Sequence, residues 1–213
     1  MRYIKFPQCP AFYIFPGCTK VVFPKHYSQR DLNNLQSLSG SQIQWRGMDI
    51  NAKKCTLKRI ENYPAYLLHQ GSFDPYIRSS LEYLSLIDDD VYYYKLLYPL
   101  DLFNNLKTVI LNDSLEQIYP NAFTNCKKLE FIEIKDKILA IANTAFQLCS
   151  NLKTVIIRAV NPPVRALEEG SQFVPPSYHK IRKYIHAKEC KIYVPDELVE
   201  TYKNHEDWIL NAD

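Results

Sequence analysis

A repeat of 23 residues runs through the second half of the chain and limits what it can fold into. Leu106, Leu129 and Leu152 lie 23 residues apart. The same spacing joins four pairs of identical residues: Ile118 and Ile141, Ala122 and Ala145, Phe123 and Phe146, and Cys126 and Cys149. A fixed period in the twenties, with apolar residues at the recurring positions, is typical of a solenoid, whose units bury their apolar faces only by stacking on their neighbours. We therefore expect a solenoid in which one repeat makes one coil.

Each repeat begins with a short apolar pattern that predicts a β strand. The segments "LKTVIL", "LEFIEI" and "LKTVII" start at Leu106, Leu129 and Leu152. Side chains alternate between the two faces of a strand, so the fourth and sixth residues of each segment should point into the core. The predicted core residues are Val109, Leu111, Ile132, Ile134, Val155 and Ile157. The segments "NAFTNC" and "TAFQLC" should then close each coil, with Phe123 and Phe146 buried as plugs.

The strand pattern extends upstream with less regular spacing. The segment "LEYLSL" at 81–86 fits it, whereas "LKRIEN" at 57–62 places Asn62 where an apolar residue is expected. We interpret both segments as further coils of the same solenoid.

Near the start of the chain the pattern is weaker still. The segment "CTKVVFP" at 18–24 has the same motif, and "YIKFP" at 3–7 reads as a related strand. Residues 28–47 break the spacing and suggest a loop or a short helix. The chain is therefore expected to comprise an irregular N-terminal segment, either degenerate repeats or a cap, at 1–56, the repeats at 57–160 and a C-terminal cap at 161–213.

The repeats and the C-terminal segment together resemble a known family. The segments "AFTNCKKLEFIEI" and "AFQLCSNLKTVII" share the pattern AFxxCxxLxxVxI, and "CKIYVPDELVETYKNHEDW" at 190–208 is similar to the cap that closes such arrays. Both resemble the BspA-type leucine-rich repeat family, found in bacterial surface proteins and in some protist ones. The resemblance implies a right-handed leucine-rich-repeat solenoid, mainly β strands and loops with a short C-terminal capping helix. It also implies a secreted or cell-surface protein that binds a protein partner, such as a host matrix or surface protein.

The cap can also be interpreted from its residues alone. The segment "KIYVP" at 191–195 predicts a strand, and Pro195 followed by two acidic residues favours the start of a helix. Apolar residues then recur at helical spacing, at Leu198, Tyr202, His205 and Ile209. We expect one helix over 195–209 that covers the last coil, because a terminal coil would otherwise leave its core open to water.

Composition and motifs argue against several other functions. The formal net charge is only +3 over 213 residues, with basic and acidic residues interleaved, which does not favour nucleic-acid binding. No apolar run of about 18 residues could span a bilayer, and no export signal is visible. Motifs for metalloproteases, serine hydrolases and phosphate loops are missing, so we expect no catalytic residues and no cofactor. The acidic segment at 87–95 lacks the calcium-loop pattern, so we expect a solvated turn there and no metal site.

The six cysteines do not indicate chemistry. No C-x-x-C pair occurs, so the tight zinc spacing and the redox motif are both missing. Cys126 and Cys149 occupy the same place in successive repeats, which predicts small apolar core residues; a disulfide between the stacked coils is the alternative. In an exported protein Cys9 and Cys18 would be the better candidates for a bridge.

Function should lie on the strand face that points away from the core. Stacked coils would align its side chains in columns, the third of which contains Asn112 and Lys135. The candidate protein-binding face comprises Tyr83, Ser85, Thr108, Ile110, Phe131, Glu133, Thr154, Ile156 and Arg158. Large apolar residues such as Phe131 on an exposed surface commonly mark an interaction site. The alternative is that the cap, residues 165–184 or a neighbouring domain covers them.

Two functions remain open. The first is a non-enzymatic protein-binding module for adhesion at the cell surface, and the second is an intracellular or mobile-element scaffold of the same fold. The residues disfavour an enzyme. Without a visible signal peptide, either the signal was removed or the protein stays in the cytoplasm.

Overall fold

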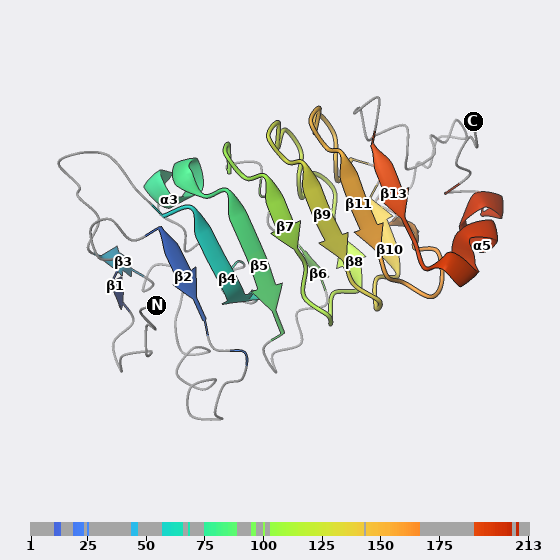
Figure 1. The fold of residues 1–213 in the computed structure, drawn as a ribbon, viewed down its shortest axis with the longest axis horizontal. Coiled ribbons are helices and arrows are strands. Elements are labelled where there is room, and N and C mark those ends of the chain that lie inside the picture. The colour runs from blue at the N-terminus through green and yellow to red at the C-terminus, as the bar shows by residue number, and fades with distance from the viewer. Residues whose placement is uncertain are drawn as a thin grey trace, which may run out of the picture.

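A computed structural model gives the fold of the chain (Figure 1). The residues that the structure describes are 11–13, 19–23, 25, 44–46, 57–65, 68, 75–88, 95–96, 100, 103–142, 144–166, 190–205 and 208. The strand that was expected at 3–7 lies outside these residues, as does most of 28–47.

One face of the molecule is a parallel sheet of seven strands (Figure 1). Its strands, in spatial order, are β2 (Lys20–Val22), β4 (Arg59–Pro64), β5 (Tyr83–Ile87), β7 (Thr108–Ile110), β9 (Phe131–Ile134), β11 (Thr154–Ile157) and β13 (Lys191–Tyr193). The spatial order follows the chain order, because each coil adds its strand beside that of the coil before it.

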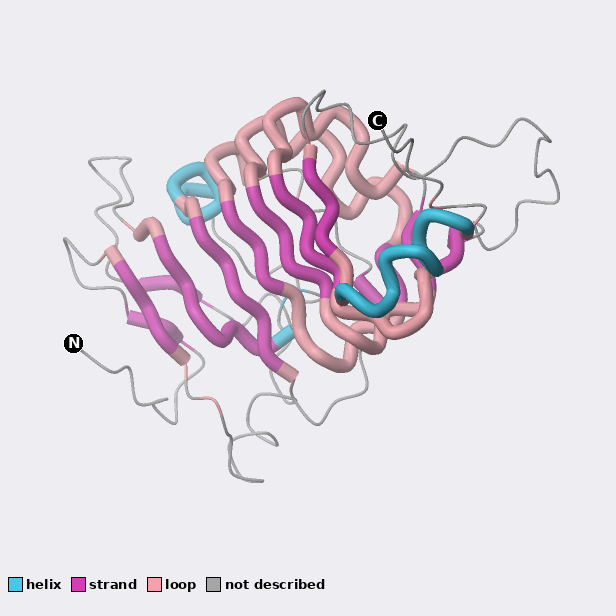
Figure 2. The backbone as a smooth tube through the Cα atoms, turned by 45° about the vertical axis from the view of Figure 1, so that its right-hand side comes forward, coloured by secondary structure: helices cyan, strands magenta, loops and turns pink. Residues whose placement is uncertain are grey.

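A second parallel sheet lies behind the first (Figure 2). It comprises β6 (Lys95–Leu96), β8 (Gln117–Ile118), β10 (Ala140–Ala142) and β12 (Val164–Ala166). Each of the four coils from β5 to β12 thus contributes one strand to each sheet and turns back through loops. A separate parallel pair is formed by β1 (Ala11–Tyr13) and β3 (Gln44–Arg46), so part of 28–47 is a strand rather than the expected loop or helix.

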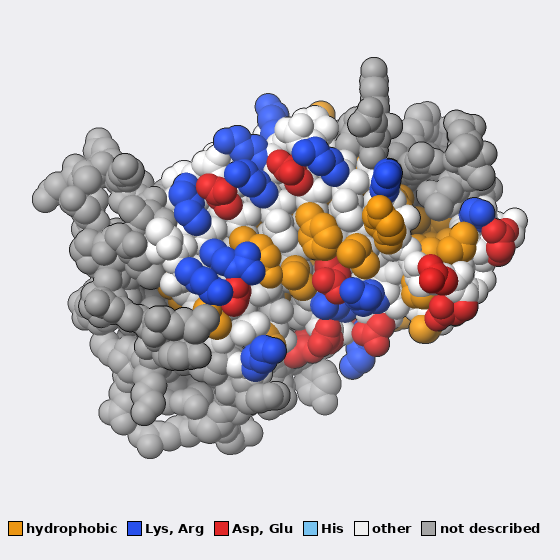
Figure 3. Space-filling view, viewed as in Figure 1, with side chains coloured by type: hydrophobic (Ala, Val, Ile, Leu, Met, Phe, Trp, Pro, Cys, Tyr) orange, Lys and Arg blue, Asp and Glu red, His pale blue; other side chains and the backbone are white. Residues whose placement is uncertain are grey.

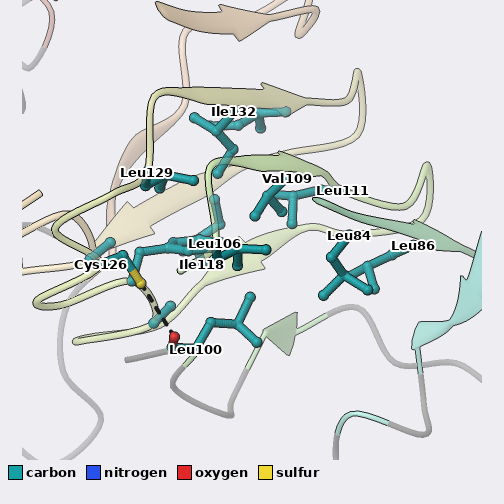
Figure 4. Packing of buried hydrophobic residues seen from close by; sticks show 14 of the residues in the cluster. Leu84, Leu86, Leu100, Leu106, Val109, Leu111, Ile118, Cys126, Leu129 and Ile132 are labelled. Carbon is teal, nitrogen blue, oxygen red and sulfur yellow. Dashed lines mark hydrogen bonds between the residues drawn. The ribbon is translucent and has the colours of Figure 1, made fainter. Parts of the chain in front are cut away.

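The core lies between the two sheets (Figure 4). Val109, Leu111, Ile132, Ile134, Val155 and Ile157 are all at most 2% exposed, which confirms the strand phase that the repeat predicts. The rings of Phe123 and Phe146 are buried and stacked, with centroids 5.2 Å apart and an interplanar angle of 6°. They form the predicted plugs, and stacked aromatic pairs add to the free energy of burial.

The repeated cysteines, Cys126 and Cys149, are reduced thiols buried in this core. Cys126 donates its Sγ hydrogen bond to the carbonyl oxygen of Leu100 at 3.3 Å (Figure 4), and Cys149 donates to that of Phe123 at 3.0 Å. Burial raises the pKa of the Cys149 thiol to about 12. The prediction of small core residues is confirmed, and the alternative of a disulfide between stacked coils is wrong. Cys9 and Cys18 lie outside the described residues.

The coil at 57–62 exists, but its core residue differs from the one its pattern indicated. β4 pairs in register with β5 up to Ile60, and then a bulge shifts the register so that Tyr63 lies opposite Leu86. Asn62 adopts a φ of 55° and stays outside the core, while Tyr63 is fully buried. One extra residue in β4 therefore brings an apolar side chain to the position that Asn62 could not fill.

Two short helical elements flank the sheets. The helix α3 (Pro75–Ser80) precedes β5 and was not expected from the sequence. At the other end a 3-10 turn, η2 (Asp196–Leu198), leads into α5 (Val199–Asn204). The C-terminal helix is thus confirmed, but it ends at Asn204 and not at residue 209.

Two aromatic residues attach the cap to the last coil. Tyr202 is fully buried, and its hydroxyl donates to the carbonyl oxygen of Ala159 at 3.0 Å. Trp208 lies beyond the helix, is 3% exposed and donates its Nε1 hydrogen to the carbonyl oxygen of Pro163 at 2.6 Å. The helical spacing indicated Tyr202 but missed Trp208; Ile209, which it also indicated, lies outside the described residues.

Candidate protein interface

The face of the seven-stranded sheet that points away from the core, here called the outer sheet face, carries the predicted columns. Strand register aligns Tyr83, Thr108, Phe131 and Thr154 in one column. The next column contains Ser85, Ile110, Glu133 and Ile156. The expected columns therefore exist, because constant register across parallel strands keeps equivalent residues of each coil side by side.

Most candidate residues are partly accessible on this face. Arg158 is exposed, and seven others are half-buried: Tyr83, Thr108, Ile110, Phe131, Glu133, Thr154 and Ile156. Ser85 differs, since it is only 8% exposed and its hydroxyl accepts a hydrogen bond from the Asn62 backbone nitrogen at 2.9 Å. Ser85 is therefore occupied within the fold.

The third column was assigned incorrectly at one position. Asn112 is 3% exposed, and its amide donates hydrogen bonds to Asp88 and Ser114. Asp88 also accepts a hydrogen bond from the Ser114 backbone nitrogen at 2.9 Å. These bonds hold the turn after β7, so Asn112 supports the loop rather than the outer sheet face.

Apolar side chains form a band over the middle and C-terminal strands of the outer sheet face (Figure 3). Ile110, Phe131 and Ile156 belong to this band by register. β13 adds Tyr193, which lies opposite Ile156 and is 51% exposed. Sequence reasoning missed Tyr193, although the alternation that points its neighbour Ile192 inward would have identified it.

A carboxylate between two cations lies at the C-terminal half of the face. Glu133 accepts hydrogen bonds from Lys135 Nζ at 2.9 Å and from Arg158 Nε at 2.7 Å. Partial burial raises the pKa of this carboxyl, but the bonds from Arg158 and Lys135 outweigh it, and the pKa lies below 4.5. Glu133 is therefore ionised at neutral pH and orients both cations.

A similar group lies at the N-terminal half. Glu61 pairs with Lys20 Nζ at 2.7 Å and with Arg59 Nε, and Arg59 also lies 3.4 Å above the centre of the Tyr83 ring. Burial raises the pKa of Glu61, but the hydrogen bonds from Lys20 and Arg59 lower it by more, so the pKa of this carboxyl is lower than usual. The cation–π contact and the ion pair together fix the Arg59 guanidinium.

A third set of charges follows the edge of the sheet where the strands begin (Figure 3). Glu82 pairs with Lys107 at 2.9 Å and with Lys58 at 3.3 Å, and Glu130 pairs with Lys153 at 3.2 Å. The hydrogen bond from Lys107 lowers the pKa of Glu82. Lysine and glutamate thus alternate from coil to coil, and we call this row the charge ladder.

The described part of the chain holds no group of three or more His, Cys, Asp or Glu residues that could bind a metal ion. Across the same residues, no helix has the length and apolar character needed to cross a bilayer. What the outer sheet face offers is apolar area, aromatic rings and fixed charges, and these are the means by which proteins recognise other proteins.

Comparison with known proteins agrees with the repeat. The family model described as BspA type leucine rich repeat region (6 copies) matches residues 101–166 of this chain. The matched range contains β7 to β12, the coils with the most regular spacing. Searches of curated proteins and of solved structures find no match.

Proposed function

Because this chain is a BspA-type leucine-rich repeat protein, we propose that it is a non-enzymatic protein-binding module that binds its partner through the outer sheet face. The observation that carries the proposal is the apolar band. Phe131 and Ile156 are accessible there, while their neighbours Ile132 and Val155 are at most 2% exposed. The band is therefore a second apolar surface, separate from the core.

The face is suited to binding because it is held rigidly. Parallel pairing fixes β5, β7, β9 and β11, and the buried plugs support each coil from behind. A rigid surface loses little conformational entropy on association, so more of the contact energy appears as affinity. Aromatic residues concentrate that energy, which makes Phe131 and Tyr193 the principal candidates for anchors.

The repeat family also supports a location and a partner class. We infer that the protein acts at the cell surface or outside the cell, in adhesion to a host matrix or surface protein. Fractionation of the producing cell tests this location. Detection of the native product only in cytosol would favour the intracellular scaffold instead.

Replacing Phe131 and Ile156 together by serine tests the binding face. The double variant should keep its melting temperature within a few degrees of the original protein. It should lose most of its binding to immobilised matrix proteins and should no longer capture partners from lysate. Leu139→Ser with Val160→Ser is the matched control, since these residues are 55% and 64% exposed and belong to neither column. If the first variant unfolds, the band is covered within the chain; if it binds undiminished, the face is not the site.

A further inference from the structure

We propose that the partner segment bound by the outer sheet face is an extended, acidic and apolar stretch of polypeptide that crosses the strands. Its apolar side chains would contact the band, and two carboxylates would bind Arg59 and Arg158. This inference rests on the proposed function, because it names the chemistry of the partner for the same face.

The two arginines are oriented in the same way. Arg59 Nε donates to Glu61, and Arg158 Nε donates to Glu133 at 2.7 Å. Each pair uses one of the five N–H donors of a guanidinium, which leaves its terminal nitrogens able to bind a second carboxylate in bidentate geometry. A glutamate on the protein thus positions each arginine before the partner arrives.

The charges on the face favour an anionic partner. Each glutamate is paired with two cations, Glu61 with Lys20 and Arg59, and Glu133 with Lys135 and Arg158. Lys191 adds a further cation beside Thr154 on β13. Among these side chains the cations outnumber the carboxylates by five to two. Such a face attracts carboxylates and repels basic segments.

The spacing of the arginines sets the length of the segment. Arg59 lies on β4, and Arg158 follows β11, four inter-strand steps away. Arg59 is in register with Thr154 through the strands between them, so Arg158 also lies four residues further along the strand direction. With about 4.8 Å between strands and about 3.3 Å per residue, the two arginine backbones are roughly 23 Å apart. An extended chain rises about 3.3 Å per residue, and the reach of the arginine side chains shortens the span, so the two carboxylates should be about five to seven residues apart.

The middle of the face distinguishes a polypeptide from a uniformly charged polymer. Tyr83, Thr108 and Ile110, on the two strands between the charged groups, are uncharged, and Phe131 lies next to them. A sulfated glycan or a nucleic acid would place charges over this apolar area and leave them without partners, which is unfavourable. A peptide with apolar residues between its acids matches both parts of the face.

Selection from a phage-displayed library of random dodecapeptides on the immobilised full chain tests the proposal. Enriched peptides should carry two acidic residues about five to seven positions apart with an aromatic or aliphatic residue between them. Binding of a labelled enriched peptide should weaken about tenfold or more with Arg59→Gln or Arg158→Gln, as expected for loss of a charge-assisted bidentate contact. Lys153→Gln is the matched control, because it removes one exposed charge from the charge ladder and not from the outer sheet face.

The outcomes separate this inference from the proposed function. One contrary outcome is that enriched peptides need Phe131 and Ile156 for binding and yet carry no acidic residues; another is that they bind both arginine variants as tightly as the original chain. Either outcome overturns the proposed chemistry of the partner, while the outer sheet face remains the binding site. Peptides that bind the Phe131→Ser and Ile156→Ser double variant equally well overturn the proposed function. A library that yields no enriched peptide also contradicts the inference.

Discussion

The coils that contain β7, β9 and β11 differ from the coils that contain β2, β4 and β5. In the first group, identical spacing carries a constant register from strand to strand, and the outer residues form open columns. In the second group, β4 contains a bulge, and the polar groups near it bond to one another. Asn62 donates through its backbone to Ser85 and through its amide to the carbonyl oxygen of Phe23.

The difference shows that a coil has two separate requirements. Every coil fills its core, whether the apolar side chain comes from the regular position or from Tyr63 after a bulge. Beside the bulge, Asn62 and Ser85 use their polar groups within the fold, whereas Arg59 and Tyr83 in the same coils stay partly accessible. A bulge therefore preserves the core but removes only the polar groups next to it from the outer sheet face.

The largest effect should come from removing a plug in the regular coils. Phe146→Ala should lower the free energy of unfolding by about 3–5 kcal/mol, because the ring is 3% exposed and stacked on Phe123. Denaturant melts measure the change, with Leu139→Ala as an exposed control. A loss below about 1 kcal/mol would mean that the plug contributes little and that the coils are held in another way.

The bulge should show an intermediate effect. Asn62→Ala should lower the free energy of unfolding by about 2 kcal/mol, since alanine tolerates the φ of 55° poorly and cannot donate to Phe23. Asn62→Gly restores the backbone freedom and should lose only about 1 kcal/mol. Equal losses for the two variants would show that the hydrogen bond alone matters at this position.

One repeat position allows a direct exchange between two coils. Asn125 and Leu148 are 23 residues apart and have φ values of 65° and 63°, and leucine is poorly suited to that region. Leu148→Asn should raise the free energy of unfolding by about 0.5–1 kcal/mol, and Asn125→Leu should lower it by a similar amount. Thermal melts of both variants test this; a loss of stability in Leu148→Asn would indicate that the leucine side chain, 49% exposed, packs usefully.

The smallest effect concerns acid. The folded-state pKa of Glu133 lies below 4.5, so its ion pairs stabilise the fold fully above about pH 4.5, and this contribution is lost as the pH falls through the folded pKa. For a partly exposed pair the loss should be about 1 kcal/mol or less. Glu133→Gln should therefore flatten the dependence of stability on pH between about 5 and 3. An unchanged slope would show that other carboxyls dominate acid unfolding.

Much of the fold follows from the period, and the departures have local causes. Spacing alone locates Val109 and Ile132 in the core and aligns the outer columns, because shifting a strand by one residue would exchange its inward and outward side chains. It does not locate the bulge at Asn62, because a bulge shifts the buried apolar residue by one position along the sequence, where a pattern with fixed spacing does not expect it. Trp208 lies beyond the helix, where helical spacing no longer applies.

The charged part of the candidate site was harder to predict. Glu133 is on the predicted face, but its pairing with Arg158 depends on contacts between neighbouring coils and on side-chain rotamers. Linear sequence separates the two residues and gives no indication that the carboxylate uses the Nε of an arginine. The same holds for Arg59 above the ring of Tyr83.

The charge ladder has a consequence for how the chain avoids misassembly. The segment "LKTVI" occurs twice, at β7 and at β11. During folding, β11 could therefore pair with β7 in the place of β9, and the coil that contains β9 would be left out of the solenoid. That skip would set Lys107 next to Lys153, and like charges directly opposite are destabilising. In the correct order Glu130 lies between them and pairs with Lys153, while Glu82 and, more weakly, Glu130 raise the pKa of Lys107. The alternation from Lys58 to Lys153 therefore disfavours an error in which an odd number of these coils is left out.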